Sequence, residues 1–240
     1  MVCRRVLLTV LLLVGWVALA PPAWADELFT INVPNADISA FPGPYASADV
    51  HLNSSTLATI TFTSDTTGPG GFTYLMGAEN AVDVNVNATS WTLGPVTGTN
   101  TGSGFSPGPY SNVGSGTVDG FGTFNQGIDS ADGFTHSATQ VTFTLTNTSG
   151  TWADASKVLK GQDGTASDPG SVAIHVFVTP AAFSSETGAV ATGFADNGAA
   201  GVPFIGPPPP PPLPVPEPGT LLLLGSGLAG LGMVTRRRGR

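Results

Sequence analysis

A serine between two glycines is the first feature of this 240-residue chain that matches a catalytic pattern. Gly104-Phe105-Ser106-Pro107-Gly108 fits the G-x-S-x-G pattern of serine hydrolases, in which the serine sits between a strand and a helix. The residue after that serine normally donates its N–H to the oxyanion, but Pro107 has no N–H. No strand pattern precedes the segment and no helix pattern follows it. We therefore interpret it as a glycine-rich loop.

Histidines are the next candidates, because they can act as acids, bases or metal ligands. Asp49 and His51 are two residues apart, so in a strand both would point to the same face and could form a pair. The other two histidines have no comparable partner nearby in the sequence. We favour the simpler interpretation of a solvated pair on a polar face. The three histidines are His51, His136 and His175.

Carboxylates in glycine-containing turns could bind calcium, which prefers oxygen ligands. The two candidate pairs are Asp163 with Asp168, and Asp129 with Asp132. Neither pair has the spacing of an EF-hand loop or of a calcium-binding nonapeptide repeat. We therefore expect no cofactor and no metal site, with calcium as the alternative.

Carbohydrate binding would require aromatic side chains that are exposed on one sheet face or loop end. The candidates are Tyr45, Trp91, Tyr110 and Trp152. A tryptophan is more often part of a core than an exposed platform, so the sequence alone does not favour this role.

Charge is distributed very unevenly along the chain. Six of the eight basic residues lie near the two ends, and the region from 26 to 215 has a formal charge of −13, from fifteen acidic residues against Lys157 and Lys160. Such a surface repels phosphate backbones, which argues against nucleic-acid binding. The only cysteine, Cys3, precedes this region, so we expect a domain without disulfides that depends on its core.

The elements that would position these residues are strands. From residue 27 to about 195, apolar β-branched or aromatic residues alternate with Thr, Asn and Asp, which is typical of half-buried antiparallel strands. Turn sequences such as Asp119-Gly120 separate the runs. The clearest runs are Val50 and Leu52; Ile60 and Phe62; Val82, Val84 and Val86; Val141, Phe143 and Leu145; and Val172, Ile174, Val176 and Val178.

Two segments depart from this alternation. The stretch from Gly94 to Gly127 is rich in small polar residues and glycine, and its aromatic residues favour long packed loops. Residues Trp152 to Leu159 are the one helical candidate, because Trp152, Ala155 and Leu159 would share a face. We expect one or two connecting turns there.

The N-terminus has the features of a secretory signal. Two arginines precede an apolar stretch from Val6 to Ala20, and Ala23 and Ala25 supply the small residues of an A-x-A cleavage site. Cleavage there would remove residues 1–25 and leave Asp26 as the first residue. An uncleaved N-terminal anchor is the alternative.

The C-terminal composition changes after Gly201. Residues 201–218 form a proline-rich linker, in which the six prolines Pro207 to Pro212 and the residues after them predict a polyproline II rod. This rod would extend about 37 Å from residue 207 to residue 218. An apolar run from Leu221 to Val234 follows. As a helix it would span roughly 21 Å, so insertion into a bilayer core of roughly 30 Å is marginal.

The order of a short motif, an apolar run and terminal arginines resembles the PEP-CTERM sorting signal of exopolysaccharide-producing bacteria. The resemblance implies that an exosortase recognises the tail, which inserts transiently in the membrane, and cleaves it near the motif. The arginines would stay cytoplasmic by the positive-inside rule. The motif is Pro216, Glu217 and Pro218, and the cluster that stops transfer is Arg236, Arg237, Arg238 and Arg240.

We therefore expect an all-β protein whose residues 26–200 form an antiparallel β-sandwich of jelly-roll or Ig-like outline. An N-terminal signal helix would precede this domain, and a C-terminal hydrophobic helix in residues 219–240 would follow the linker. We expect an exported protein of the cell envelope or extracellular matrix without catalytic activity. Its expected partners are the exosortase and the export machinery, with exopolysaccharide as a further candidate. The alternatives are a carbohydrate-binding module for exopolysaccharide and an extracellular hydrolase.

Overall fold

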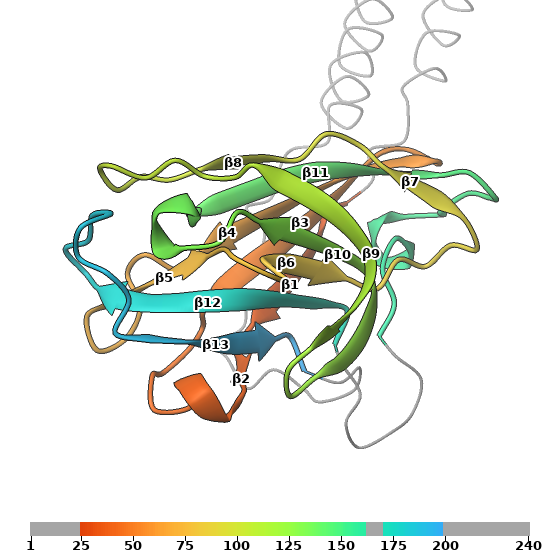
Figure 1. The fold of residues 1–240 in the computed structure, drawn as a ribbon. Helices are drawn as coiled ribbons and strands as arrows, with labels where there is room; N and C mark the ends of the chain where they lie inside the picture. The colour runs from red at the N-terminus through yellow and green to blue at the C-terminus, as the bar shows by residue number, and fades with distance from the viewer. Residues whose placement is uncertain (1–24, 162–169, 199–240) are drawn as a thin grey trace, which may run out of the picture. The chain divides into compact units, whose positions relative to one another are not determined.

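The computed structural model describes residues 25–161 and 170–198 (Figure 1). The predicted signal helix, proline-rich linker and hydrophobic tail lie outside these residues, as does the turn that contains Asp163 and Asp168. The described chain consists of strands in two sheets, linked by turns and by three short 3-10 helices. These helices are η1 (Ala36–Ile38), η2 (Phe134–His136) and η3 (Ala155–Lys157).

The first sheet, called sheet A, is built around three long strands that alternate apolar and polar residues. Its strand order is β1-β3-β4-β11-β7, and β8 also pairs with β11. Because β7 pairs with one end of β11 and β8 with the other, the two short strands follow each other along one edge. The strands are β1 (Glu27–Ile31), β3 (Ala46–Ser54), β4 (Leu57–Ser64), β7 (Trp91–Leu93), β8 (Thr97–Thr99) and β11 (Gln140–Asn147).

The second sheet, sheet B, has the order β2-β13-β12-β6-β10-β9, with β5 also paired to β12. One of its edges is the two-residue strand β2, and the other is β9, whose pairing with β10 is interrupted by bulges. The strands are β2 (Val33–Pro34), β5 (Phe72–Met76), β6 (Val82–Val84), β9 (Tyr110–Val118), β10 (Gly122–Ser130), β12 (Val172–Pro180) and β13 (Ala191–Asp196).

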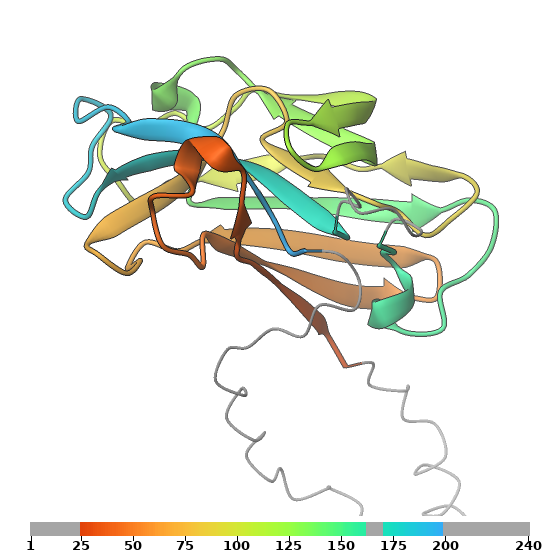
Figure 2. The same ribbon diagram turned by 90° about the horizontal axis from the view of Figure 1, so that it is seen from below.

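The two sheets pack face to face as a β-sandwich, as the sequence predicts. Figure 2 shows the β3–β4 hairpin in one layer and the β12–β13 pair in the other. The alternating apolar residues form the core between them, and Ile60, Phe62 and Val176 have no exposed surface. All pairings between the named strands are antiparallel, as the alternation in the sequence predicts.

A second, smaller apolar cluster covers the outer face of sheet B. We call this the outer cluster, and it comprises Val118, Phe121, Phe124 and Ala173, with Phe194 packed against it. It corrects one expectation from the sequence, in which the polar residues that alternate with Val82, Val84 and Val86 lie on the unburied face of a half-buried strand; here they are Asp83 and Asn85. Both residues are buried, with 0 % and 2 % of their surface exposed, because that face is covered.

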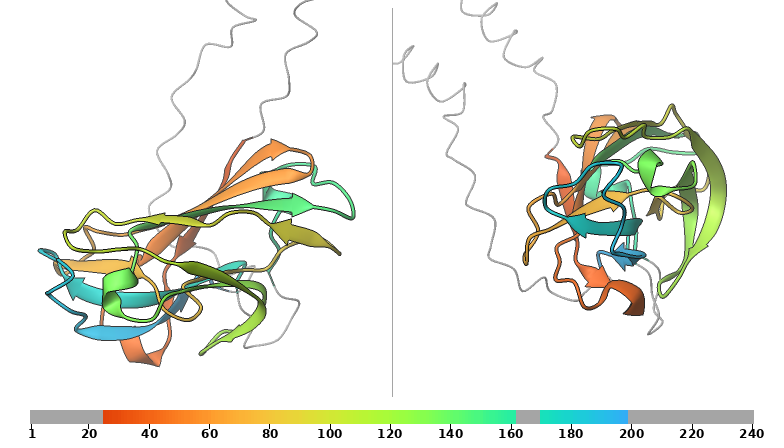
Figure 3. Two further views of the ribbon diagram at one scale, coloured as in Figure 1. Left: turned by 45° about the horizontal axis from the view of Figure 1, so that its top comes forward. Right: turned by 60° about the vertical axis from the view of Figure 1, so that its left-hand side comes forward.

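The prediction of long loops between Gly94 and Gly127 is wrong. This stretch contains β8 and most of the β9–β10 hairpin, a long curved hairpin at the side of the sandwich (Figure 3). Gly114 and Gly120 have φ angles of 67° and 86°, which glycine adopts without a Cβ clash, so the hairpin bends there. The short turn predicted near Trp152 is confirmed as η3, and Trp152 and Leu159 pack into the main core.

Candidate functional site

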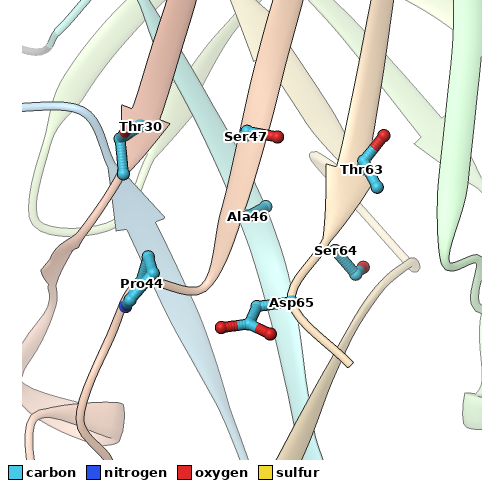
Figure 4. Close-up of a pocket in the computed structure, with 7 residues that line it drawn as sticks. All are labelled: Thr30, Pro44, Ala46, Ser47, Thr63, Ser64 and Asp65. Atoms are coloured by element: carbon cyan, nitrogen blue, oxygen red, sulfur yellow. The ribbon is translucent and has the colours of Figure 1, made fainter. Parts of the chain in front are cut away.

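A shallow groove lies at one end of sheet A, where β1 and β4 end and β3 begins (Figure 4). Its volume of about 310 Å³ is at the lower end of the range for small-ligand sites. Asp65 supplies the only carboxylate among the lining residues, and its Oδ1 accepts hydrogen bonds from the backbone N–H and hydroxyl of Thr67, at 2.8 and 3.2 Å. The groove is lined by Thr30, Pro44, Ala46, Ser47, Thr63, Ser64 and Asp65.

Three hydroxyl groups of the groove, those of Thr30, Ser47 and Thr63, belong to a larger polar face, whereas Ser64 is buried and donates to the carbonyl oxygen of Ala138 at 3.4 Å. Ser47 lies opposite Thr30 of β1 and Thr63 of β4, and residues directly opposite in antiparallel strands share a face. The next row continues the pattern, since Thr61 and Thr142 have their hydroxyl oxygens 3.3 Å apart. Hydroxyls both donate and accept hydrogen bonds, so this face suits a neutral ligand rich in hydroxyl groups.

No local sequence motif marks this groove. Its residues are far apart in the chain, and only the strand register brings them together. The alternation of apolar and polar residues is the one signal for the groove residues in the sequence, because it places Ser47 and Thr63 on the outward faces of their strands.

The Asp49–His51 pair is replaced by a different contact in the structure. His51 Nδ1 lies 2.6 Å from Asp26 Oδ1, and both side chains are about half exposed. Burial raises the pKa of Asp49, and the negative charge of Asp26 raises it further. Asp26 is the first residue after the predicted signal cleavage site, so the contact between His51 and Asp26 lies beside the exposed Ala25.

The other two histidines are held by structural contacts in separate places. His136 Nδ1 lies 2.8 Å from the carbonyl oxygen of Ser106, not from its hydroxyl, and the G-x-S-x-G segment is a loop as expected. His175 Nε2 lies 2.7 Å from the hydroxyl oxygen of Thr192, and its ring stacks on Phe194 with centroids 4.4 Å apart. Burial lowers the pKa of His175. No group of three His, Cys, Asp or Glu residues that could hold a metal ion occurs in residues 25–161 and 170–198.

The aromatic candidates do not form an exposed platform. Tyr45 and Trp152 lie in the main core, with 1 % and 3 % of their surface exposed. Trp91 is half-buried and donates its Nε1–H to Gln126 Oε1 at 3.0 Å. Burial raises the pKa of Tyr110 to about 12, and its hydroxyl accepts or donates no hydrogen bond within the described part of the chain.

The residues predicted to direct sorting lie outside the described part of the structure, apart from Ala25. Comparison with known families does reach them, because residues 214–238 match the model of the PEP-CTERM protein-sorting motif. The chain carries a PEP-CTERM sorting motif. The matched range contains Pro216, Glu217 and Pro218, the apolar run, and three of the four arginines of the terminal cluster. No curated protein and no solved structure matches the chain.

The PEP-CTERM motif implies an exported protein that an exosortase processes. Such a protein passes through the membrane to the cell envelope or to the outside of the cell. None of the helices in the described residues is long and apolar enough to span a membrane.

Proposed function

We propose that this PEP-CTERM protein is a non-catalytic component of the bacterial cell envelope or extracellular matrix. In this role residues 1–25 are removed on export, and the proline-rich linker separates the β-sandwich from the membrane while exosortase acts at the motif. The match of residues 214–238 to the sorting motif supports the delivery part of the proposal. The three histidines support the non-catalytic part, because each is held by its own structural contact.

The intact mass of the protein tests this proposal. The full chain would be produced in an exosortase-bearing host and recovered from the cell envelope and from the culture medium. We expect a species that starts at Asp26 and ends near Pro216. A variant with Pro216, Glu217 and Pro218 replaced by alanine should keep its tail and stay with the membrane.

A matched control makes three alanine substitutions in the same proline-rich region. Replacing Pro207, Pro208 and Pro209 by alanine changes three residues of the same region but leaves the motif intact, so processing should continue. A wild-type protein that still ends at Arg240 in the membrane fraction would contradict exosortase processing. It would leave a protein anchored by its C-terminus.

The groove in sheet A favours a second role, which is contact with exopolysaccharide. Its hydroxyls and the Asp65 carboxylate offer the hydrogen-bonding groups that sugar hydroxyls need. Affinity electrophoresis in gels containing the polysaccharide of the host would detect retardation of the wild-type protein. Thr63→Leu removes a hydroxyl from the groove, whereas Thr123→Leu makes the same change on the exposed side of β10. Equal retardation of the wild-type protein and both variants would contradict binding in the groove.

A further inference from the structure

Asp83 lies in the middle of sheet B and projects from its outer face. It is directly opposite Ala173 of β12 on one side and Gly127 of β10 on the other. Because directly opposite residues share a face and Ala173 belongs to the outer cluster, Asp83 lies on the side that the β9–β10 hairpin covers. The neighbouring valines, Val82 and Val84, instead face the main core.

The backbone of the hairpin packs tightly against the Asp83 carboxyl group. A Cβ atom at Gly127 of β10 would lie only 2.7 Å from Asp83 Oδ1, which is closer than real side chains approach. A Cβ atom at Gly116 of β9 would lie 3.9 Å from the same oxygen, which is ordinary van der Waals contact. Both strands of the hairpin therefore take part in separating this carboxyl group from water.

The buried carboxyl group has no polar partner. The exposed fraction of Asp83 is 0 %, and neither of its oxygens forms a hydrogen bond with any described residue. An ionised carboxylate in this place would lose its hydration without replacement, which costs far more than burying a neutral acid. The protein avoids this cost in two ways: the carboxyl group keeps its proton, or the hairpin opens and water reaches it.

The nearest acidic groups make ionisation of Asp83 harder. Asp129 of β10 is two residues from Gly127, so it is a diagonal neighbour of Asp83 on the same face. Asp196 of β13 lies in the same row across β12, because it is directly opposite Ala173. Burial raises the pKa of Asp83 well above its usual range, and the negative charge of Asp129 raises it further. The closed hairpin therefore holds the proton on Asp83 firmly.

The other ionisable groups on the surrounding elements do not offset this effect. His175 of β12 is on the same face, but burial lowers its pKa, and its ring nitrogens contact the Glu79 carbonyl oxygen at 3.0 Å and the Thr192 hydroxyl at 2.7 Å. Lys157 and Lys160 lie beyond the end of β6, where both are exposed. The remaining groups are acidic or neutral, namely Glu79 in the loop before β6, Tyr110 of β9, Asp119 in the hairpin turn and Asp132 after β10.

We propose that Asp83 is a pH-sensitive latch for the β9–β10 hairpin. While the carboxyl group is protonated, the hairpin packs over it and covers the outer cluster. When the pH rises and the proton is lost, the charged group is stable only in contact with water, so the hairpin opens more often. Each opening uncovers Val118, Phe121 and Phe124, so the exported protein exposes more apolar surface at high pH than at low pH.

Linkage between protonation and opening gives the direction and the steepness of the effect. In the open hairpin Asp83 is hydrated and titrates near its ordinary pKa of 3.8, whereas its pKa in the closed hairpin is much higher. Between these two values the closed form holds a proton that the open form has released, so each pH unit favours opening about tenfold more. The latch is therefore fully effective below about pH 4 and weakens as the pH rises toward the pKa of the closed form.

Hydrogen exchange of the protein recovered from the exosortase-bearing host tests the latch. Protection factors, which correct for the intrinsic pH dependence of exchange, would be measured by mass spectrometry from about pH 5 to 8. We expect the protection of β9 and β10 in the wild type to fall about tenfold per pH unit below the pKa of the closed form. Asp83→Asn keeps the shape of the side chain but cannot ionise, so its protection should stay nearly constant. Asp132→Asn removes an exposed carboxylate of the same region and should behave as the wild type.

A second measurement keeps the test independent of any folding defect in Asp83→Asn. Infrared spectroscopy of the wild type should show a protonated carboxyl group at about pH 6, where ordinary carboxyl groups are ionised. A folded wild type without this protonated group would overturn the proposal. Near-ultraviolet circular dichroism would report whether each variant is folded.

The exchange data overturn the latch in three cases. In the first, the protection of β9 and β10 in the wild type does not depend on pH. In the second, folded Asp83→Asn keeps the dependence of the wild type. In the third, β4 has the same protection as β9 and β10 at every pH, because the hairpin would then open only when the whole domain unfolds.

Discussion

All three tyrosines of the chain should resist ionisation at alkaline pH while the protein is folded. Burial raises the pKa of Tyr45, and it raises the pKa values of Tyr74 and Tyr110 to about 12. The Tyr45 and Tyr74 hydroxyls donate to the carbonyl oxygens of Phe41 and Pro42, both at 2.5 Å. Removing either proton would therefore bury a charge and break a hydrogen bond.

The size of the effect follows from linkage between ionisation and unfolding. In the unfolded chain tyrosines ionise near pH 10, so between about pH 10 and 12 the folded protein binds more protons than the unfolded chain. The free energy of unfolding must then fall as the pH rises through this range. Each pKa unit corresponds to about 1.4 kcal/mol, so Tyr74 and Tyr110 together remove up to about 5 kcal/mol by pH 12. Screening by water at the half-buried Tyr110 ring reduces this figure.

Near-ultraviolet absorbance of the phenolate, measured with circular dichroism from about pH 9 to 12, tests this reasoning. A domain with a stability of about 5 kcal/mol, at the low end of the usual range, should show little phenolate near pH 10 and then unfold cooperatively near pH 12, with both signals changing together. The same titration in guanidinium chloride should give an ordinary midpoint near pH 10. Tyr110→Phe should shift the unfolding transition to higher pH. A phenolate midpoint near pH 10 in the folded protein, at unchanged circular dichroism, would refute the reasoning.

Other variants test how the two apolar clusters contribute to stability. Phe124→Ala should loosen the β9–β10 hairpin alone, because Phe124 belongs to the small outer cluster, and native-state hydrogen exchange should show lost protection in β9 and β10. Phe62→Ala should instead lower the global free energy of unfolding in urea by about 3–5 kcal/mol, because Phe62 lies in the main core. Equal loss of protection in β4 for both variants would contradict separate clusters. Trp152→Phe removes the donor of a 2.8 Å hydrogen bond to the carbonyl oxygen of Asn87, and should cost about 1–3 kcal/mol in the same urea assay. An unchanged midpoint would mean that water replaces the lost donor.

Local patterns predicted the central strands well, because each has one apolar face against the main core. Ile60 and Phe62 in β4 are two residues apart, and so are Phe143 and Leu145 in β11. All four are buried, as this spacing predicts. The alternation does not specify which strands pair. The order of the strands in each sheet depends on contacts between residues far apart in the chain, so the sequence predicted a sandwich but not its topology.

The β9–β10 hairpin was missed because glycine hides the alternation on which the prediction depends. Gly114 and Gly116 occupy inward positions where an apolar residue would have marked a strand. The burial of Asp83 has a related cause, since the hairpin that covers it lies about thirty residues or more further along the chain. The groove in sheet A likewise depends on strand register. The sorting motif needed no tertiary structure, because its three parts are contiguous.

The irregular edges of the two sheets have a consequence for the protein after export. A long regular edge strand offers unpaired N–H and C=O groups to a neighbouring molecule, which can then add its own strand and begin a fibril. Here β2 is only two residues long and contains Pro34, β7 and β8 are three residues each, and the pairing of β9 with β10 is interrupted by bulges beside Gly127 of β10. The other edge of sheet A is β1, which pairs with β3 over five residues without a bulge. The short and interrupted edges give an incoming strand no continuous ladder to join, and β1 offers one of only five residues. Copies of the exported protein therefore meet mostly along short or interrupted edges, which disfavours the addition of strands from one molecule to the next.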